Sequence, residues 1–311
     1  MAAKVNLPQQ PQPRLQPSCP AGQVVLAYLR QQVDLLKSLD PLVRADEPDS
    51  VHQMRVAGRR LRSTLRTFRD IVGPAGAARA ASELKWLGGV LGEVRDAEVL
   101  DRHLRASLDH VPVEQLIGPV QARVQGHFAR VRAAAREKAL AALDSPRYFA
   151  LLDDLDTLMA APERTQEAAR AAKDVLPAAV RRPAKQARRR MRKAWAKPAG
   201  EPRDLALHQA RKSAKRARYA AEVASPALGK QARRFAKQMK KVQSALGDHQ
   251  DAVICRRADR ELGIAAHLAG ENAFTYGLLH ERDTVRGDRS QARARQVWQQ
   301  ASRSRYRRWL G

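Results

Sequence analysis

The chain has 311 residues and a formal net charge of +26 at pH 7, with 58 Lys and Arg against 32 Asp and Glu. This length is sufficient to bury a full core. The charge predicts a polyanionic partner, namely nucleic acid, a phosphate polymer or an anionic membrane, because an unpartnered basic surface costs self-repulsion. No run reaches the roughly 18 apolar residues of a membrane span, so we expect none.

Residues 1–20 are rich in Pro and Gln, which predicts a disordered tail, and they contain no apolar segment typical of a secretory signal. The two cysteines, Cys19 and Cys255, lie far apart and match no metal-ligand spacing. That usage indicates a reducing compartment without disulfides. We therefore predict a cytoplasmic protein with one domain over residues 21–311, and no metal or cofactor.

Beyond the tail, nearly the whole chain has helical periodicity interrupted by Pro, Gly or Asp, and no stretch alternates like a strand. A polar connection is expected over residues 162–173. The predicted helices are 22–44, 50–72, 75–93, 95–109, 114–143, 146–160, 175–196, 204–224, 227–246, 248–267 and 271–300. The sequence therefore predicts an all-α fold, as the Ala-rich and aromatic-poor composition also does.

The chain also resembles itself. VHQMRVAGRRLRSTL at 51–65 aligns with LHQARKSAKRARYAA at 207–221, and LGEVRDA at 91–97 aligns with LGDHQDA at 246–252. The two pairs follow in the same order at nearly the same separation. We therefore predict a tandem duplication, with halves of roughly 21–163 and 170–311 related by a pseudo-two-fold axis.

Each copy of the first motif carries an apolar stripe and a cationic stripe, one residue or about 100° apart on a helix. Like charges at these spacings oppose helix formation by ~0.2–0.5 kcal/mol per pair, so a surface without a partner would include more acids. The row in the first copy is about 25 Å long, which suits a linear chain of phosphates. The cationic stripes consist of His52, Arg55, Arg59, Arg62, Arg66 and Arg69 in the first copy, and His208, Arg211, Lys215 and Arg218 in the second.

Glu222 stands where the first copy has Arg66, so we expect the second row to be shorter. His52 and His208 are each expected within about the first turn of a helix, after the cap candidates Asp49 or Ser50 and Asp204. A helix N-terminus favours anions, and a histidine there can donate to phosphate. A purely structural role is the alternative for each histidine.

The two histidine motifs, each followed by its LG motif, resemble the CHAD family, the conserved-histidine α-helical domains, over nearly the whole chain beyond the tail. The resemblance implies two four-helix bundles about a pseudo-dyad, and a basic surface from both halves that binds inorganic polyphosphate, with association at polyphosphate granules. We add Arg66 and Lys212 to the residues that the resemblance implies. The predicted polyphosphate-binding residues are then His52, Arg55, Arg59, Arg60, Arg62, Arg66, His208, Arg211, Lys212, Lys215, Arg216 and Arg218.

Many relatives carry an N-terminal triphosphate-tunnel domain with alternating Glu and Lys, a pattern that residues 1–50 lack. We therefore expect a stand-alone binding protein rather than an enzyme. A further basic run, RRPAKQARRRMRK at 181–193, is expected to widen the groove, with a solvated face as the alternative. The secondary basic candidates are Arg182, Lys185, Arg189, Lys85 and Lys240.

Two other functions stay open. Acids recur in the LG motifs, at Glu93, Asp96, Asp248 and Asp251. They would serve as metal ligands or general bases in a metal-dependent enzyme, but no metalloprotease-like or Walker-type motif supports this, and we favour caps or ion pairs with the stripe arginines. Sequence-blind nucleic-acid binding is the second alternative, although no aromatic side chains interleave the stripes as base-stacking surfaces.

Overall fold

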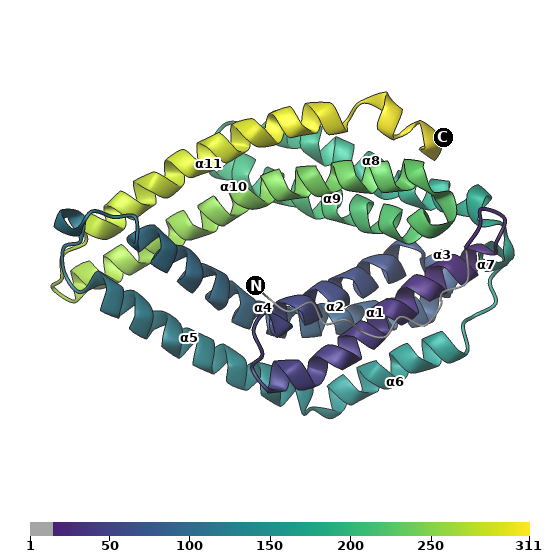
Figure 1. Ribbon diagram of the computed structural model, residues 1–311, viewed down its shortest axis with the longest axis horizontal. Helices are drawn as coiled ribbons and strands as arrows, with labels where there is room; N and C mark the ends of the chain where they lie inside the picture. Colours follow the sequence, from purple (N-terminus) through teal and green to yellow (C-terminus); the bar gives the residue numbers. More distant parts are fainter. Residues whose placement is uncertain (1–14) are drawn as a thin grey trace.

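The computed structural model describes residues 15–311, and these form an all-helical protein without a β-sheet (Figure 1). The first half of the chain contains α1 (Ala21–Arg44), α2 (Ser50–Thr67), α3 (Arg69–Val72), α4 (Pro74–Leu108), η1 (Val113–Gln115), α5 (Val120–Leu143) and α6 (Pro146–Ala160). The short α7 (Gln166–Ala169) connects it to the second half. That half contains α8 (Ala172–Trp195), α9 (Glu201–Leu228), α10 (Lys230–Leu268), α11 (Phe274–Ala301), η2 (Ser304–Tyr306) and η3 (Arg308–Leu310).

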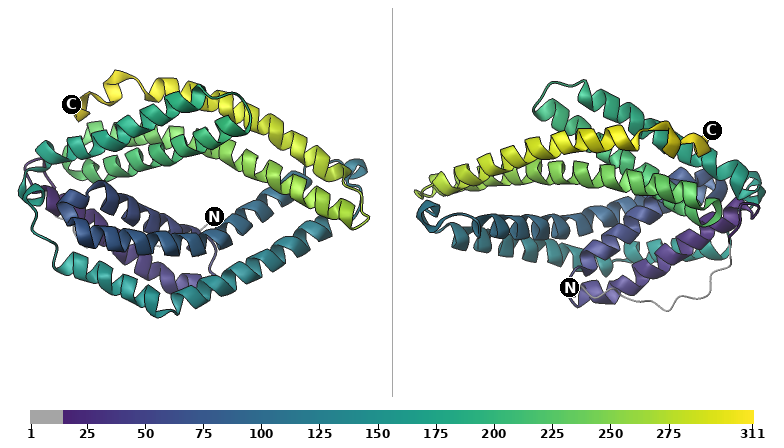
Figure 2. Two further views of the ribbon diagram at one scale, coloured as in Figure 1. Left: turned by 180° about the vertical axis from the view of Figure 1, so that it is seen from behind. Right: turned by 45° about the horizontal axis from the view of Figure 1, so that its top comes forward.

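Neighbouring helices pack in chain order in both halves. In the first, α1 packs on α2, α2 on α4 and α4 on α5, and in the second, α8 packs on α9, α9 on α10 and α10 on α11. The halves meet where α2 contacts α9, and again where α4 contacts α10, at opposite ends of the long axis (Figures 1 and 2). The all-helical prediction is confirmed, whereas the duplication itself stays a prediction.

The apolar stripes form the core as expected. Val51, Met54, Leu61 and Leu65 of α2 are all buried, and so are the alanines of the corresponding stripe of α9. Burying one such large side chain contributes ~1.5–3 kcal/mol, so this stripe fixes which face of α2 points inward. The cationic stripe, one residue away, is thereby held at the edge of the core.

There are two apolar clusters among the described residues. The main one takes side chains from both halves, including the stripes of α2 and α9. The second lies at the other end, where Leu104 of α4 and Phe128 of α5 pack with Leu262 of α10 and Tyr276 of α11. The halves are therefore joined by apolar packing at both ends.

The predicted helix breaks at 93–95 and 246–248 are wrong, because α4 and α10 continue through them. Gly92 and Gly247, which lie at or next to those breaks, are buried inside the helices. Burial against neighbouring side chains outweighs the weak helix propensity of glycine at these positions. The helix expected over 50–72 shows the opposite error, since α2 ends at Thr67 and a separate short helix, α3, follows.

The predicted tail extends too far. The backbone N–H of Ala172 donates to Cys19 O at 2.8 Å, and that of Lys173 donates to Pro17 O at 2.9 Å. Residues 17–20 therefore belong to the fold, while residues 1–14 of the predicted tail lie outside the described residues. None of the helices described has the length and apolar character that crossing a membrane requires.

Candidate functional site

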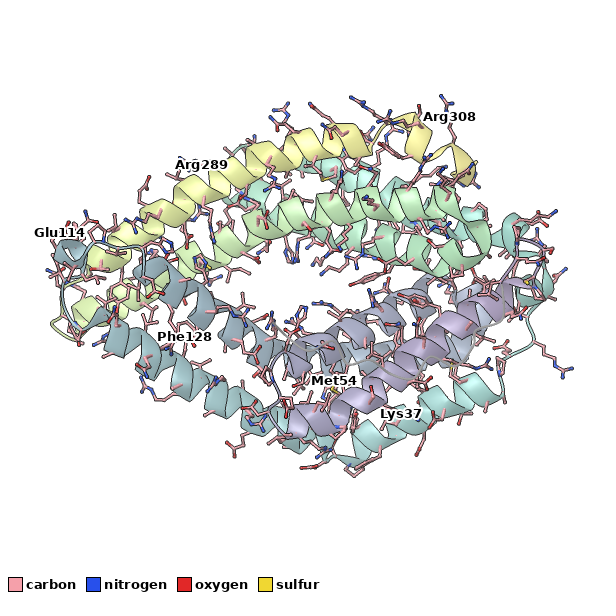
Figure 3. The ribbon with its side chains drawn as sticks, viewed as in Figure 1. Lys37, Met54, Glu114, Phe128, Arg289 and Arg308 are labelled. Carbon is pink, nitrogen blue, oxygen red and sulfur yellow. The ribbon has the colours of Figure 1, made fainter. Side chains whose placement is uncertain are left out.

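The cationic stripes of α2 and α9 converge where these helices meet. Burial lowers the pKa of the Arg59 guanidinium, and the charges of Arg55 and Arg211 lower it further. Burial also lowers the pKa of Lys215 to about 7, with contributions from Arg211 and Arg59. Charges on one helix thus act on groups of the other. We call Arg55, Arg59, Arg211 and Lys215 the central cluster; nitrogen-bearing side chains on the facing sides of the two halves are visible in Figure 3.

The central cluster keeps unused hydrogen-bond donors. Among the described residues, the buried Nε atoms of Arg55, Arg59 and Arg211 have no hydrogen-bond partner. A buried donor without a partner costs ~1–3 kcal/mol, and the mutual repulsion of the cations adds to that cost. An anion placed among these groups would relieve both penalties.

Acidic residues neutralise part of the predicted set. Arg55 Nη1 donates to Asp96 Oδ1 at 2.9 Å, as the ion-pair interpretation of the LG-motif acids expects. Arg218 Nε donates to Glu222 Oε1 at 2.7 Å, and Arg60 Nη2 lies 3.8 Å from Glu222 Oε2. Arg60 and Arg218 therefore offer less uncompensated charge than Arg59 and Lys215.

The glycines of the LG motifs lie under two stripe arginines. A Cβ atom added to Gly92 would lie 3.0 Å from Arg55 Nη2, and one added to Gly247 would lie 3.5 Å from Arg211 Nε. The two recurring motifs of each half are thus in contact, with the guanidinium group resting on a helix surface that lacks a side chain. We did not predict this contact from the sequence, although the same Leu-Gly pair in both motifs was its signal.

His52 and His208 lie beside the central cluster. Burial lowers the pKa of both imidazoles, with Arg95 as the next cause at His52 and Lys212 at His208. Both rings are therefore uncharged at pH 7 in the free protein. His52 lies at the predicted place in its helix, whereas His208 does not.

His52 is in the first turn of α2, as predicted, but the helix-terminus prediction for His208 is wrong. α9 begins at Glu201, with Pro202 in its first turn, so His208 is in the helix interior. Asp204 is not a cap either, because its carboxylate lies 3.1 Å from His249 Nε2 and 3.2 Å from Arg256 Nη2. The N-cap position of α2 is Asp49, and its side chain makes no capping hydrogen bond.

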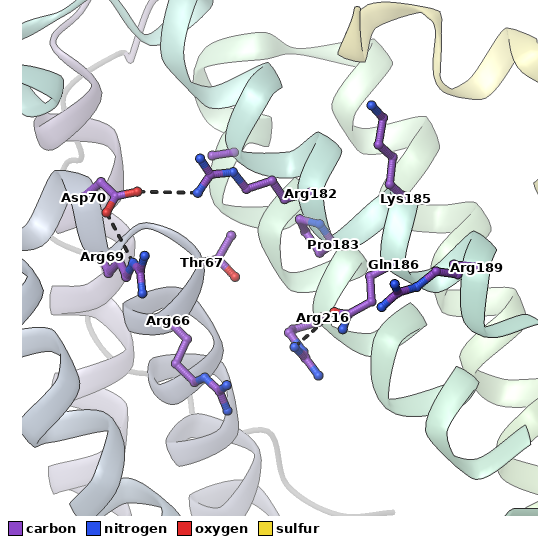
Figure 4. Close-up of a pocket in the computed structure, with 11 residues that line it drawn as sticks. Arg66, Thr67, Arg69, Asp70, Arg182, Pro183, Lys185, Gln186, Arg189 and Arg216 are labelled. Carbon is purple, nitrogen blue, oxygen red and sulfur yellow. Dashed lines mark hydrogen bonds and ion pairs between the residues drawn. The ribbon is translucent and has the colours of Figure 1, made fainter. Parts of the chain in front are cut away.

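A pocket of about 490 Å³ extends the basic region toward α8 (Figure 4). Arg66 of α2 and Arg216 of α9 line it together with Arg182, Lys185 and Arg189 of α8. The charges of Arg66 and Arg62 contribute to a lowered pKa of Arg216, after burial as the main cause. The structure thus places three of the five secondary candidates beside the primary set. The lining of this pocket also includes one acidic residue, Asp70, which lies 3.6 Å from Arg182.

The remaining candidates are less closely associated with the cluster. Lys85 of α4 and Lys240 of α10 are exposed, and neither lines the pocket beside α8. Lys212 is also exposed but acts on His208.

One aromatic residue does lie between the stripes, contrary to expectation. The guanidinium carbon of Arg218 is 5.0 Å from the ring centre of Tyr219, and that of Arg60 is 5.9 Å from it. The sequence signal was the Arg-Tyr pair inside the motif itself. Because Tyr219 is only 3% exposed, its ring packs against the cations and offers no face for a nucleobase.

These features define an all-helical protein with a cationic site assembled between its two halves. The model of the CHAD domain family matches residues 27–258, and the chain belongs to this family. Two Mycobacterium tuberculosis proteins, MT2285 of strain CDC 1551 / Oshkosh and Rv2226 of strain ATCC 25618 / H37Rv, are each 38% identical over 289 residues. The match covers 91% of this chain and 53% of each relative, so the chain spans about half the length of these curated relatives.

Solved structures show the same fold. PptA from Streptomyces chartreusis superposes with a TM-score of 0.71 at 24% identity, covering 90% of this chain and 99% of PptA. The CHAD domain from the plant Ricinus communis superposes with a TM-score of 0.67 at 26% identity, covering 93% of this chain and 96% of that domain. The CHAD resemblance of the sequence is thereby confirmed.

Proposed function

We propose that this chain binds inorganic polyphosphate without turning it over, and that it associates with polyphosphate granules in the cytoplasm. The observation that carries the proposal is the central cluster, where Arg59, Arg211 and Lys215 converge from two helices and pair with no acidic side chain of the described residues. Guanidinium groups donate in forked pairs to phosphate oxygens, and an ammonium group adds a point charge.

The extent of the basic region favours a polymer over a single phosphate. Cations continue from the central cluster through Arg62 to the pocket that Arg66, Arg216 and Arg189 line. A single phosphate ion would contact only a few of these groups. A flexible chain carrying about one charge per phosphate can reach many of them in sequence.

The burial of the cluster argues against nucleic acid. Arg59 and Lys215 are only partly exposed, so a rigid duplex approaching from outside would contact mainly the exposed cations at the margins. A single strand is thinner, but its binding sites usually present aromatic faces for stacking, and Tyr219 is buried.

A competition titration tests the choice of polymer. We expect duplex DNA, at equal phosphate concentration, to displace labelled long-chain polyphosphate only weakly from this chain. Displacement at similar phosphate concentrations would contradict the proposal and favour general phosphate-backbone binding. The release of phosphate with Mg²⁺ or Mn²⁺, if it is lost on His52→Ala, would instead support the metal-dependent enzyme.

A charge-reversal pair tests the site itself. Arg59→Glu with Lys215→Glu should abolish polyphosphate binding, because two attractions at the centre become repulsions, while the helix signal in circular dichroism is retained. The matched control is Arg132→Glu with Arg260→Glu, which removes the same charge from exposed positions on α5 and α10. Equal losses in the two variants would mean that net charge alone governs binding, and would refute this site.

A further inference from the structure

A second group of chemically active side chains lies where α4 of the first half meets α10 and α11 of the second. We call it the junction cluster: His103 of α4, Cys255 of α10 and Asp283 of α11, whose ligand atoms lie together, with Asp259 of α10, which adjoins Asp283. Cys255 and Asp259 are four residues apart on α10, so they project from the same face of that helix. The cluster shares no residue with the basic site, and the polyphosphate proposal gives it no role.

Three of the four residues of this cluster already bring their ligand atoms close together. One ligand atom each from His103, Cys255 and Asp283 lie within 4.8 Å of one another. His103 Nε2 is 3.0 Å from Asp283 Oδ2. Four donors around a tetrahedral zinc ion, at 2.0–2.3 Å from it, lie roughly 3.3–3.8 Å apart. Side-chain rotations of small size would therefore place these atoms around one ion.

Asp259 supplies an independent reason to expect a ligand. Its side chain is 0% exposed, and apart from the Asp283 carboxyl group its oxygens have no hydrogen-bond partner among the described residues. The Asp283 carboxyl group of α11 is the neighbour of its carboxyl group, which places Asp259 against the cluster. Two carboxyl groups buried against each other are expensive, whereas a bound cation would satisfy the oxygens of both.

The surrounding charge fits a divalent ion. Among residues 15–311, the cation in contact with the cluster is Arg286, whose Nε lies 3.1 Å from Asp283 Oδ1 and whose Nη1 lies 3.1 Å from His103 Nδ1. Ser107 Oγ completes the polar contacts, 3.2 Å from His103 Nε2. With Cys255 as thiolate and both aspartates ionised, three negative charges face one arginine. A single divalent ion neutralises the two negative charges that remain.

We propose that His103, Cys255, Asp259 and Asp283 bind one divalent transition-metal ion, with zinc as the best match. A thiolate, an imidazole and carboxylates are donors that zinc accepts in tetrahedral sites, whereas Mg²⁺ and Ca²⁺ take oxygen ligands. On binding, the Cys255 thiol releases its proton to solvent. The four protein ligands close the coordination sphere, so the ion is structural and ties α4 to α10 and α11.

Cobalt substitution tests this site with the full chain, stripped by a chelator and kept free of polyphosphate, which itself binds metals. We expect one Co²⁺ per chain, a thiolate-to-cobalt charge-transfer band, and displacement of Co²⁺ by stoichiometric Zn²⁺. The band should vanish in Cys255→Ser and persist in the matched control Cys19→Ser. Asp259→Asn should bind Zn²⁺ at least about tenfold more weakly, since even partners of metal ligands contribute that much.

A second variant distinguishes loss of metal binding from loss of folding, which is needed because Cys255 and Asp259 are fully buried. His103→Gln changes a less buried position, so its helix signal should be retained while Zn²⁺ affinity falls by a similar factor. Absence of a stoichiometric ion in the wild-type chain would overturn the proposal. A cobalt band that survives Cys255→Ser and disappears in Cys19→Ser would overturn it equally.

Discussion

Under the proposed function, Lys215 should make polyphosphate binding a proton-coupled reaction. Its pKa of about 7 in the free protein results from burial and from the charges of neighbouring arginines. At pH 8, therefore, only about one in ten of these side chains carries a proton. A phosphate chain beside the ammonium group would return its pKa toward the ordinary value near 10.4, so binding should take up about 0.9 proton.

The sign of the pH dependence follows from this uptake. The charged form of Lys215 is the one that should bind the polyanion, so we expect the affinity to be highest below pH 7. Above it, affinity falls by up to about tenfold per pH unit until the pKa of the bound state is reached.

Isothermal calorimetry at pH 8, in two buffers of different ionisation enthalpy, measures the uptake directly. The control is Lys215→Arg, which keeps the positive charge but cannot lose it in this pH range. We expect that variant to bind with buffer-independent heat and with little change of affinity between pH 7 and 9. Buffer-independent heat for the wild-type chain, or the same uptake in Lys215→Arg, would refute the reasoning.

Two further predictions concern the glycine and histidine positions. Gly92→Ala would place a Cβ atom 3.0 Å from Arg55 Nη2 and displace that guanidinium group, so polyphosphate affinity should fall severalfold. The control is Gly89→Ala, whose added Cβ atom meets nothing within 4 Å. That change should only stabilise α4, by up to about 1 kcal/mol. If both changes leave affinity unchanged, the contact does not position Arg55. Because folding lowers the pKa of His52 and His208, the unfolded chain binds more protons just below pH 6.5, and stability should fall as pH decreases through that range. Urea unfolding at pH 7.5 and 5.5 measures this, and the loss should be smaller when both histidines are replaced by Gln.

Helices and their buried faces were predictable because they depend on local spacing. The helical spacing of Val51, Met54, Leu61 and Leu65 specified one face of α2, and the structure buries that face. The helix ends were less predictable, because Gly92 looks like a stop signal unless its contact with Arg55 is known. That contact joins two motifs on different helices, and no local pattern contains it.

The candidate site was predicted in composition but not in detail. The recurring cations identified which helices matter, and those helices do face each other. Which cations remain uncompensated depends on Glu222 and Asp96, whose partners are decided by helix packing. The junction cluster escaped prediction for the same reason, since His103 and Cys255 lie far apart in the chain and meet only through the contact of α4 with α10.

The continuity of α4 and α10 has a consequence for cooperativity. Leu84 and Leu104, on the same helix, belong to the main and the second apolar cluster respectively, and Phe235 and Leu262 do so on α10. Loss of either cluster would leave half of each long helix without its packing surface. We therefore expect the whole domain to melt in a single transition, with neither half persisting as a folded intermediate.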